Sequence, residues 1–229
     1  MHFLLLSVAL ATPPIPIGAL LDKMASAEAA LRDATYTVER SEWTGGRQLP
    51  TQEIAVRYRR PEELLLRWAN TYPGRAVLYR QGWNDGRLRV RPASMIPLLN
   101  LDPLGSLAMR DARHPVWMVS LSRVVGRILK ATRLLTARPE LVARYTDEGE
   151  QDVGGTPSRC YSAVLPYAEE PGVYAPRVRI CAGIDSHLPT RFSAWKAEDG
   201  QVRQVEDYVF RDLTVNPGLS DADFDTAGL

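Results

Sequence analysis

The chain has 229 residues, of which 45% are hydrophobic and 24% are charged, so one domain can bury a sizeable core. Its 28 Lys and Arg residues nearly balance its 27 Asp and Glu residues. This balance leaves no broad basic field to steer the protein to nucleic acid, and nucleic-acid binding is not expected.

The first residues have the features of an export signal. The apolar stretch from Phe3 to Ala11 ends in the small residues that a signal peptidase prefers. We therefore predict a signal peptide at residues 1–11 and a soluble protein in the periplasm. Only Met1 and His2 precede the stretch, which leaves a weak signal, an upstream start or a buried N-terminal element as alternatives. No other apolar run approaches the roughly 20 residues of a membrane span.

Two cysteines, Cys160 and Cys181, lie in neighbouring segments that both read as strands. In an exported protein this pair predicts a disulfide that closes a loop of about 20 residues and stabilises the fold by about 3 kcal/mol. If the segments pair as antiparallel strands with the cysteines opposed, Leu165 lies opposite Pro176, which lacks an N–H. The alternative is two free buried thiols. Without nearby His partners or a C-x-x-C spacing, the pair fits neither zinc nor redox chemistry.

The mature chain is expected to begin with a helix. Residues 13–16, Pro-Pro-Ile-Pro, predict a stiff linker. Beyond it, apolar residues at helical spacing predict an amphipathic helix over residues 17–33 that lies across one face of a sheet. These residues are Ile17, Leu20, Leu21, Met24, Ala27 and Leu31.

From Thr35 the hydrophobic period changes to two, which predicts antiparallel strands with one exposed side. Asp85-Gly86 lies between two such runs and predicts a hairpin, because both residues tolerate positive φ. The alternating apolar residues are Ile54, Val56 and Tyr58, then Leu64, Leu66 and Trp68, then Val77, Tyr79, Leu88 and Val90.

The segment from Ser94 to His114 is rich in leucine but broken by Pro97, Pro103 and Gly105, which predicts short helical turns. Pro115 suits the first turn of a longer helix. We expect the apolar stripe of that helix to be buried and its basic residues to face outward. The stripe is Leu121, Val124, Val125, Ile128, Thr132 and Leu135, and the basic residues are Arg123, Arg127, Lys130 and Arg133.

Strands are expected to resume after this helix, with a second hairpin at Asp199-Gly200. Because helices do not alternate with strands, the pattern predicts an α+β fold in which one large antiparallel sheet coils around helices. The whole of residues 17–229 is expected to form one domain. The predicted strands are 141–145, 159–165, 177–182, 190–195 and 202–210.

The C-terminal half resembles the periplasmic lipoprotein-carrier and lipoprotein-localisation superfamily, in Ile184–Arg191, Trp195–Gly200 and Tyr208–Phe224. More closely, residues 20–226, with Leu101-Asp102-Pro103 and Arg113-His114-Pro115, resemble domain of unknown function family 1571, a family of uncharacterised bacterial proteins. The resemblance implies a strongly curved antiparallel sheet forming an incomplete barrel, closed by helices over an apolar cavity. In the carriers that cavity receives lipid acyl chains. No carrier motif maps residue by residue onto this chain, so no ligand-contacting residue is carried over.

The sequence offers little for catalysis. His114 lies near Asp111, Arg113, Ser120 and Ser122, the one cluster suggestive of a hydrolytic triad. No Gly-x-Ser-x-Gly elbow accompanies it. We interpret His114 as a residue that caps or orients the start of the helix at Pro115, and predict that the protein is not an enzyme and needs no cofactor.

Two acidic runs, Asp147–Asp152 and Asp221–Asp225, raise the question of calcium. Neither has the alternating ligands and closing Glu of a helix-loop-helix calcium site. We interpret the first as a polar hairpin and the second as a terminal turn with Phe224 packed inward. No metal site is predicted.

The basic helix face is a sharper feature, because no acid occurs between Val116 and Ala137. A face of one sign favours an anionic partner such as lipid headgroups, a phosphate or an acidic protein. The alternative is a solvated face balanced by acids from elsewhere in the fold.

We therefore predict a monomeric, non-enzymatic periplasmic protein that holds a lipid, or the acyl chain of a lipoprotein, in an apolar cavity. The alternative is a sensor or assembly module that binds another envelope protein through a sheet edge or the basic face. The expected cavity residues are Ile54, Val56, Tyr58, Leu64, Leu66 and Trp68 on the sheet, with Leu98, Leu99, Leu101, Leu104 and Leu107 as the lid.

Overall fold

The computed structural model describes residues 17–93, 96–137, 144–165 and 173–225. The predicted signal peptide, the linker and the first residues of the strand expected from Leu141 lie outside these ranges. Within the described residues, no helix is long and apolar enough to cross a membrane.

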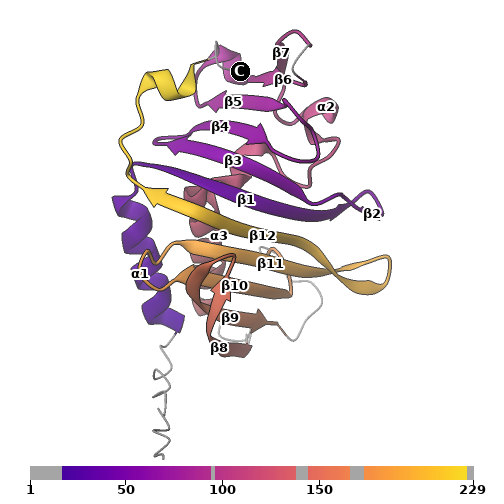
Figure 1. Cartoon of the computed structure of the whole chain (residues 1–229). Helices are drawn as coiled ribbons and strands as arrows, with labels where there is room; N and C mark the ends of the chain where they lie inside the picture. Colours follow the sequence, from indigo (N-terminus) through magenta and orange to yellow (C-terminus); the bar gives the residue numbers. More distant parts are fainter. Residues whose placement is uncertain (1–16, 94–95, 138–143, 166–172, 226–229) are drawn as a thin grey trace, which may run out of the picture.

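Twelve antiparallel strands form one open sheet, in the order β7-β6-β5-β4-β3-β1-β12-β11-β10-β9-β8, with β2 paired to β1 (Figure 1). The predicted α+β fold with an incomplete barrel is confirmed, since the sheet does not close. The order follows the chain except at the centre, where the last strand lies beside the first. The strands are β1 Asp33–Thr44, β2 Arg47–Gln48, β3 Gln52–Arg59, β4 Glu63–Trp68, β5 Ala76–Arg80, β6 Leu88–Arg91, β7 Leu99–Leu101, β8 Arg144–Val153, β9 Thr156–Val164, β10 Arg177–Gly183, β11 Pro189–Glu198 and β12 Gln201–Val215.

The period-two pattern gives the sheet two different faces. Along β3, every second residue from Gln52 to Tyr58 is buried, while the residues between them are at least partly exposed. Opposed pairs such as Tyr58 with Leu64 and Val56 with Leu66 place these apolar residues of β4 on the same side. We call this side, which carries Tyr36, Val38, Ile54, Val56, Tyr58, Leu64 and Leu66 in the main core, the inner face.

Three helices accompany the sheet: α1 Ile17–Ala30, α2 Ser106–Met109 and α3 Leu121–Ala137. Figure 1 shows α3 behind the strands, where its buried residues join the main core. α1 packs beside α3, so both helices lie on one side. The buried residues are Leu20, Leu21 and Met24 of α1 and Leu121, Val124, Val125 and Ile128 of α3.

The prediction of one continuous helix from Pro115 is wrong. A 3-10 turn, Val116–Val119, follows Pro115, and Ser120 is extended at ψ 138° before α3 begins. α1 likewise ends before residue 33, because Asp33 already pairs with Arg59 in the sheet. At the end of α1, the local helix signal therefore gives way to sheet pairing.

The outer face of the sheet is covered near β4 and β5 by the C-terminal 3-10 turn, Asp221–Phe224. Phe224 is buried there against Leu65, Ala76 and Leu78. The predicted inward packing of Phe224 is confirmed.

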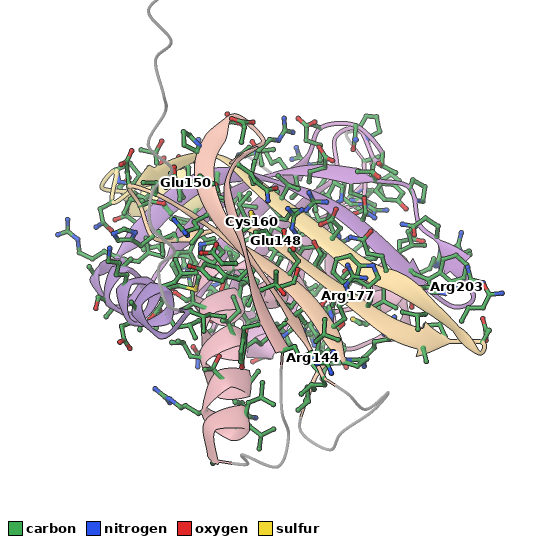
Figure 2. All side chains as sticks on the ribbon, turned by 90° about the horizontal axis from the view of Figure 1, so that it is seen from below. Arg144, Glu148, Glu150, Cys160, Arg177 and Arg203 are labelled. Carbon is green, nitrogen blue, oxygen red and sulfur yellow. A yellow bond between two sulfur atoms is a disulfide. The ribbon has the colours of Figure 1, made fainter. Side chains whose placement is uncertain are left out.

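Cys160 and Cys181 are opposed on β9 and β10 and form a disulfide. The predicted bond and register are both confirmed, because the N–H of Leu165 donates to the carbonyl of Pro176 at 2.7 Å. At this position Pro176 supplies an acceptor, so its missing N–H costs no ladder bond. Figure 2 labels Cys160 on β9 beside Glu148 of the edge strand β8.

We predict that denatured, unreduced protein exposes no titratable thiol and that reduction releases two. Replacing both Cys160 and Cys181 with Ala should lower the free energy of unfolding by about 3 kcal/mol, because the bond restrains a loop of about 20 residues in the unfolded chain. Urea denaturation of the two proteins measures the difference. Two reactive thiols before reduction would refute the bond.

Candidate functional site

A pocket of about 220 Å³ opens on the inner face, beyond the part of the sheet that α3 covers. We call it the β4–β7 pocket, because those strands form one wall and residues 103–116 form the other. Its volume is below the roughly 300–1,000 Å³ of pockets for drug-sized ligands, so it suits a narrow ligand. The apolar lining includes Leu66, Trp68, Val77, Leu88, Val90, Leu99, Leu101, Leu107, Ala108 and Val116.

One end of this pocket is polar. Arg40, Arg75, Arg110, Asp111 and His114 contribute to its lining. The pocket therefore combines a long apolar wall with a small set of charged groups.

Behind that polar end, Gln52 holds two side chains in place. Its Oε1 accepts hydrogen bonds from Arg40 Nη2 at 2.7 Å and from Trp68 Nε1 at 2.8 Å. Arg40 and Trp68, both of which line the pocket, are thereby fixed relative to each other.

A second, smaller pocket of about 70 Å³ lies between α1, α3 and strands β9 and β10. We call it the α1–α3 pocket. Its lining is mostly apolar, and the charged group among the lining residues is Arg127. The apolar part includes Leu21, Ile128, Leu135, Leu165, Ile180 and Phe192.

A buried polar cluster separates the two pockets. Glu206 on β12 is 0% exposed, and its carboxylate lies 2.8 Å from His114 Nε2 and 3.4 Å from Arg127 Nη2. His114 Nε2 is also 2.9 Å from the hydroxyl of Tyr174. Because His114 lines the β4–β7 pocket and Tyr174 lines the α1–α3 pocket, one layer of hydrogen bonds divides them.

The charges around Glu206 decide its ionisation. Burial by itself would raise the pKa of the Glu206 carboxyl, but the hydrogen bond from His114 and the positive charges of His114 and Arg127 hold that pKa below its ordinary value. Burial, followed by the nearby charge of Glu206, raises the pKa of Tyr174. The cluster therefore contains an ionised carboxylate and a neutral phenol.

A second buried carboxylate lies at the end of the same network. Glu42 on β1 is almost fully buried and accepts hydrogen bonds from the hydroxyl of Tyr208 and, at 2.9 Å, from the backbone N–H of Arg113. The Arg113 side chain turns outward to Glu198 at 3.0 Å. Residue 113 is thus tied to the sheet through both its backbone and its side chain.

The predicted cavity residues divide into three groups in the structure. Leu66, Trp68 and the lid residues Leu99, Leu101 and Leu107 line the β4–β7 pocket. Leu98 packs instead in the outer-face cluster, and Leu104 is 64% exposed. Ile54, Val56, Tyr58 and Leu64 lie in the main core with α3 and line neither inner-face pocket.

The prediction that all four basic residues of α3 face outward is wrong for Arg127. Its guanidinium pairs with Glu206 and stacks over the ring of Tyr174 at 4.1 Å. Arg123 is more exposed but pairs with the buried Glu62 at 2.6 Å. Lys130 and Arg133 are exposed, as expected. Acids distant in sequence therefore balance half of this face.

The cluster around His114 does not assemble a triad. Ser120 Oγ accepts the backbone N–H of Arg123, and Ser122 Oγ pairs with the hydroxyl of Tyr58. His114 neither caps the following turn, where Pro115 is the cap residue, nor contacts these serines among its described hydrogen bonds. In the described ranges, no group of three His, Cys, Asp or Glu side chains could hold a metal ion.

Sequence reasoning missed Glu206 and Glu42, although a signal was present. Glu206 precedes the inner-face residues Tyr208 and Phe210 by steps of two, and Glu42 continues the series of Tyr36 and Val38. Strand period alone therefore places both carboxylates on the inner face.

The open sheet, the helices on its inner face and the apolar pocket between them define a lipoprotein-carrier-like fold. The chain belongs to the family described as protein of unknown function (DUF1571), whose model matches residues 31–228. No curated protein matches the chain.

Solved structures with this fold share little sequence with the chain. Mycobacterium tuberculosis lipoprotein LppX is 13% identical at a TM-score of 0.51, over 91% of this chain and 99% of LppX. MucB is 16% identical at a TM-score of 0.50, over 91% of this chain but 62% of MucB, and it has also been solved in complex with MucA. A LolA superfamily protein from Nitrosomonas europaea is 10% identical at a TM-score of 0.39, over 94% of this chain and 100% of that protein. At these identities the similarity to LppX and MucB shows the fold alone.

We predict that Glu206→Gln lowers the free energy of unfolding by about 3 kcal/mol, because it leaves Arg127 and His114 beside a neutral group in a buried site. The matched control is Glu198→Gln, which removes a partly exposed pair with Arg113 and should cost no more than about 1 kcal/mol. Urea denaturation at pH 7 measures both. Equal costs would contradict a structural role for the buried carboxylate.

The same variant should show a distinct acid dependence. Because the folded-state pKa of Glu206 lies below its unfolded value of about 4.3, its ionised form stabilises the fold above that pH. This stabilisation is lost as the pH falls through the lower folded-state pKa. The gap in unfolding free energy between wild type and Glu206→Gln should therefore narrow from pH 6 to pH 3, and a gap that stays constant over this range would exclude the assignment.

Proposed function

We propose that this protein is an exported, non-enzymatic binding protein that holds the acyl chain of a lipid or lipoprotein in the β4–β7 pocket. The observation that carries the proposal is the composition of that pocket, with a long apolar wall and one polar end. An acyl chain gains free energy from burial against the apolar wall. A head group would remain at the polar end or in solvent.

The mouth of the pocket supports ligand entry from a lipid phase or a partner. Leu99 and Leu107, which line the pocket, are 40% and 59% exposed. Ile96, in the same stretch of chain, is also exposed. Exposed apolar side chains grouped in this way are typical of binding surfaces.

The fold supports the same proposal and a periplasmic location. LppX, which has a comparable fold, is itself a lipoprotein. This similarity raises the expectation of an envelope role, while the pocket determines which class of ligand is proposed.

A second candidate function, binding of an envelope protein, is favoured by the sheet edge at β8. This ten-residue strand ends the sheet and pairs with β9 in the described part of the chain. An extended segment of a partner could add as a further strand there. A partner captured from envelope extract that is unaffected when the β4–β7 pocket is blocked would favour this candidate over acyl-chain binding.

We predict that Ala108→Trp blocks the pocket, because Ala108 on α2 lines it and the larger side chain would occupy part of its volume. The affinity for a fluorescent fatty-acyl probe should fall at least about tenfold. The matched control is Leu104→Trp, an exposed position in the same segment that does not line the pocket. Thermal unfolding shows that both variants are folded.

Mass spectrometry of an organic extract of the purified protein provides an independent readout. Wild type and Leu104→Trp should carry a co-purified lipid that Ala108→Trp lacks. Unchanged probe binding in Ala108→Trp, or no lipid in any of the three proteins, would count against the proposal.

A further inference from the structure

We propose that the β4–β7 pocket selects ligands with an anionic head group, a carboxylate or a phosphate, which Arg40 and Arg75 bind at its polar end. The inference rests on the proposed acyl-chain binding and names the chemical class of that ligand.

The first observation is a buried arginine with one donor that lacks a hydrogen-bond acceptor. Arg40 lines the pocket and is 6% exposed. Its Nη2 donates to Gln52, but its buried Nε has no hydrogen-bond acceptor among the described residues. Glu42 forms an ion pair with Arg40 at 3.9 Å from Nε, a separation too long for a hydrogen bond. A buried charged donor without an acceptor is costly, so a ligand oxygen at this position would be favoured.

Glu42 does not compete strongly for this position. Its carboxylate already accepts hydrogen bonds from Tyr208 and from the backbone of Arg113. Those donors hold it away from the pocket lining, to which Glu42 does not belong.

The second observation is that Arg75, just before β5, contacts aromatic rings and forms no ion pair with a described carboxylate. Its guanidinium stacks over the ring of Tyr72 at 3.5 Å and lies 5.7 Å from the ring of Trp68. In the described part of the chain, no carboxylate forms an ion pair with it. Burial is the main cause that lowers the pKa of Arg75, which is typical of a partly desolvated cation without full compensation. The rings of Tyr72 and Trp68 orient this cation, and Tyr72 also hydrogen-bonds with it, but neither ring supplies a full negative charge, which an anionic ligand would add.

The third observation is the balance of charge in the lining. Three arginines line the pocket against one acid, Asp111, and the charge of that acid is shared between Arg47, at 3.6 Å, and the nearby Arg75. The α1–α3 pocket differs, because its lining arginine, Arg127, is already paired with Glu206. An anionic head group therefore fits the β4–β7 pocket and not the other.

The test compares ligands that share an eight-carbon chain and differ at the head. Octanoate, octyl phosphate and 1-octanol are titrated by calorimetry into delipidated, full-length protein. We expect at least one anion to bind about tenfold or more tightly than 1-octanol, as charge-assisted hydrogen bonds allow. Tighter binding of octyl phosphate indicates a phosphate head, and tighter binding of octanoate indicates a free carboxylate.

Arg75→Gln should reduce the preference for the anion over 1-octanol to less than about threefold. Arg75 is partly exposed, so this variant should fold, and Arg40→Gln, checked by thermal unfolding, gives the second measurement. The matched control is Arg87→Gln, which removes an exposed charge beside β6 outside the pocket and should keep the wild-type preference.

Two outcomes separate this inference from the proposed function. If 1-octanol binds as tightly as the anions, or Arg75→Gln and Arg87→Gln behave alike, the head-group assignment is overturned while acyl-chain binding stands. If none of the three ligands binds, both are overturned.

Discussion

Four buried side chains of α3 anchor the helix on the inner face of the sheet, and this contact decides which part of the sheet remains open. α3 has 17 residues and is therefore about 26 Å long. The eleven strands in continuous order spread over about 50 Å at their usual spacing. One helix cannot cover that width, so other segments must cover the two flanks. Over β4–β7 the cover is residues 103–116, and beside β9 and β10 it is α1. Each flank contains one of the two pockets.

The buried polar groups hold the first of these covers against the sheet. The carbonyl of Asp111 accepts hydrogen bonds from Arg40 at 3.4 Å and from Gln52 at 3.3 Å, while the N–H of Arg113 donates to Glu42. His114 completes the attachment through Glu206. These bonds involve backbone atoms or buried charges, so they fix the position of residues 111–114. They leave the space beneath Leu107 and Ala108 unfilled. Fixed polar contacts at one end and loosely covered apolar residues at the other produce a pocket with a polar end.

Much of the sheet could be predicted from local pattern, because strand period and turn residues are short-range signals. The opposed cysteines and the hairpin at Asp199, whose φ is +53°, follow from such signals. The position of Arg127 could not be predicted in this way, since its partner Glu206 lies on the last strand. Local pattern also could not predict which apolar residues line the pocket. Ile54 and Leu66 have the same pattern along their strands and both belong to the main core, but Leu66 also lines the β4–β7 pocket and Ile54 does not, a difference that strand period does not predict.

The polar cluster also limits how far a ligand chain can extend. His114 belongs to the lining of the β4–β7 pocket and therefore bounds the space open to an acyl chain there. Beyond His114 lies Tyr174, which belongs to the wall of the α1–α3 pocket. To pass between the pockets, a chain would have to separate His114 from both Glu206 and Tyr174. Each broken hydrogen bond to a charged group costs about 1.5–3 kcal/mol, whereas each methylene gained contributes about 0.8 kcal/mol. Opening the partition is therefore unfavourable for a chain that gains only a few methylenes in a second pocket of about 70 Å³, and the partition favours short or partly inserted chains.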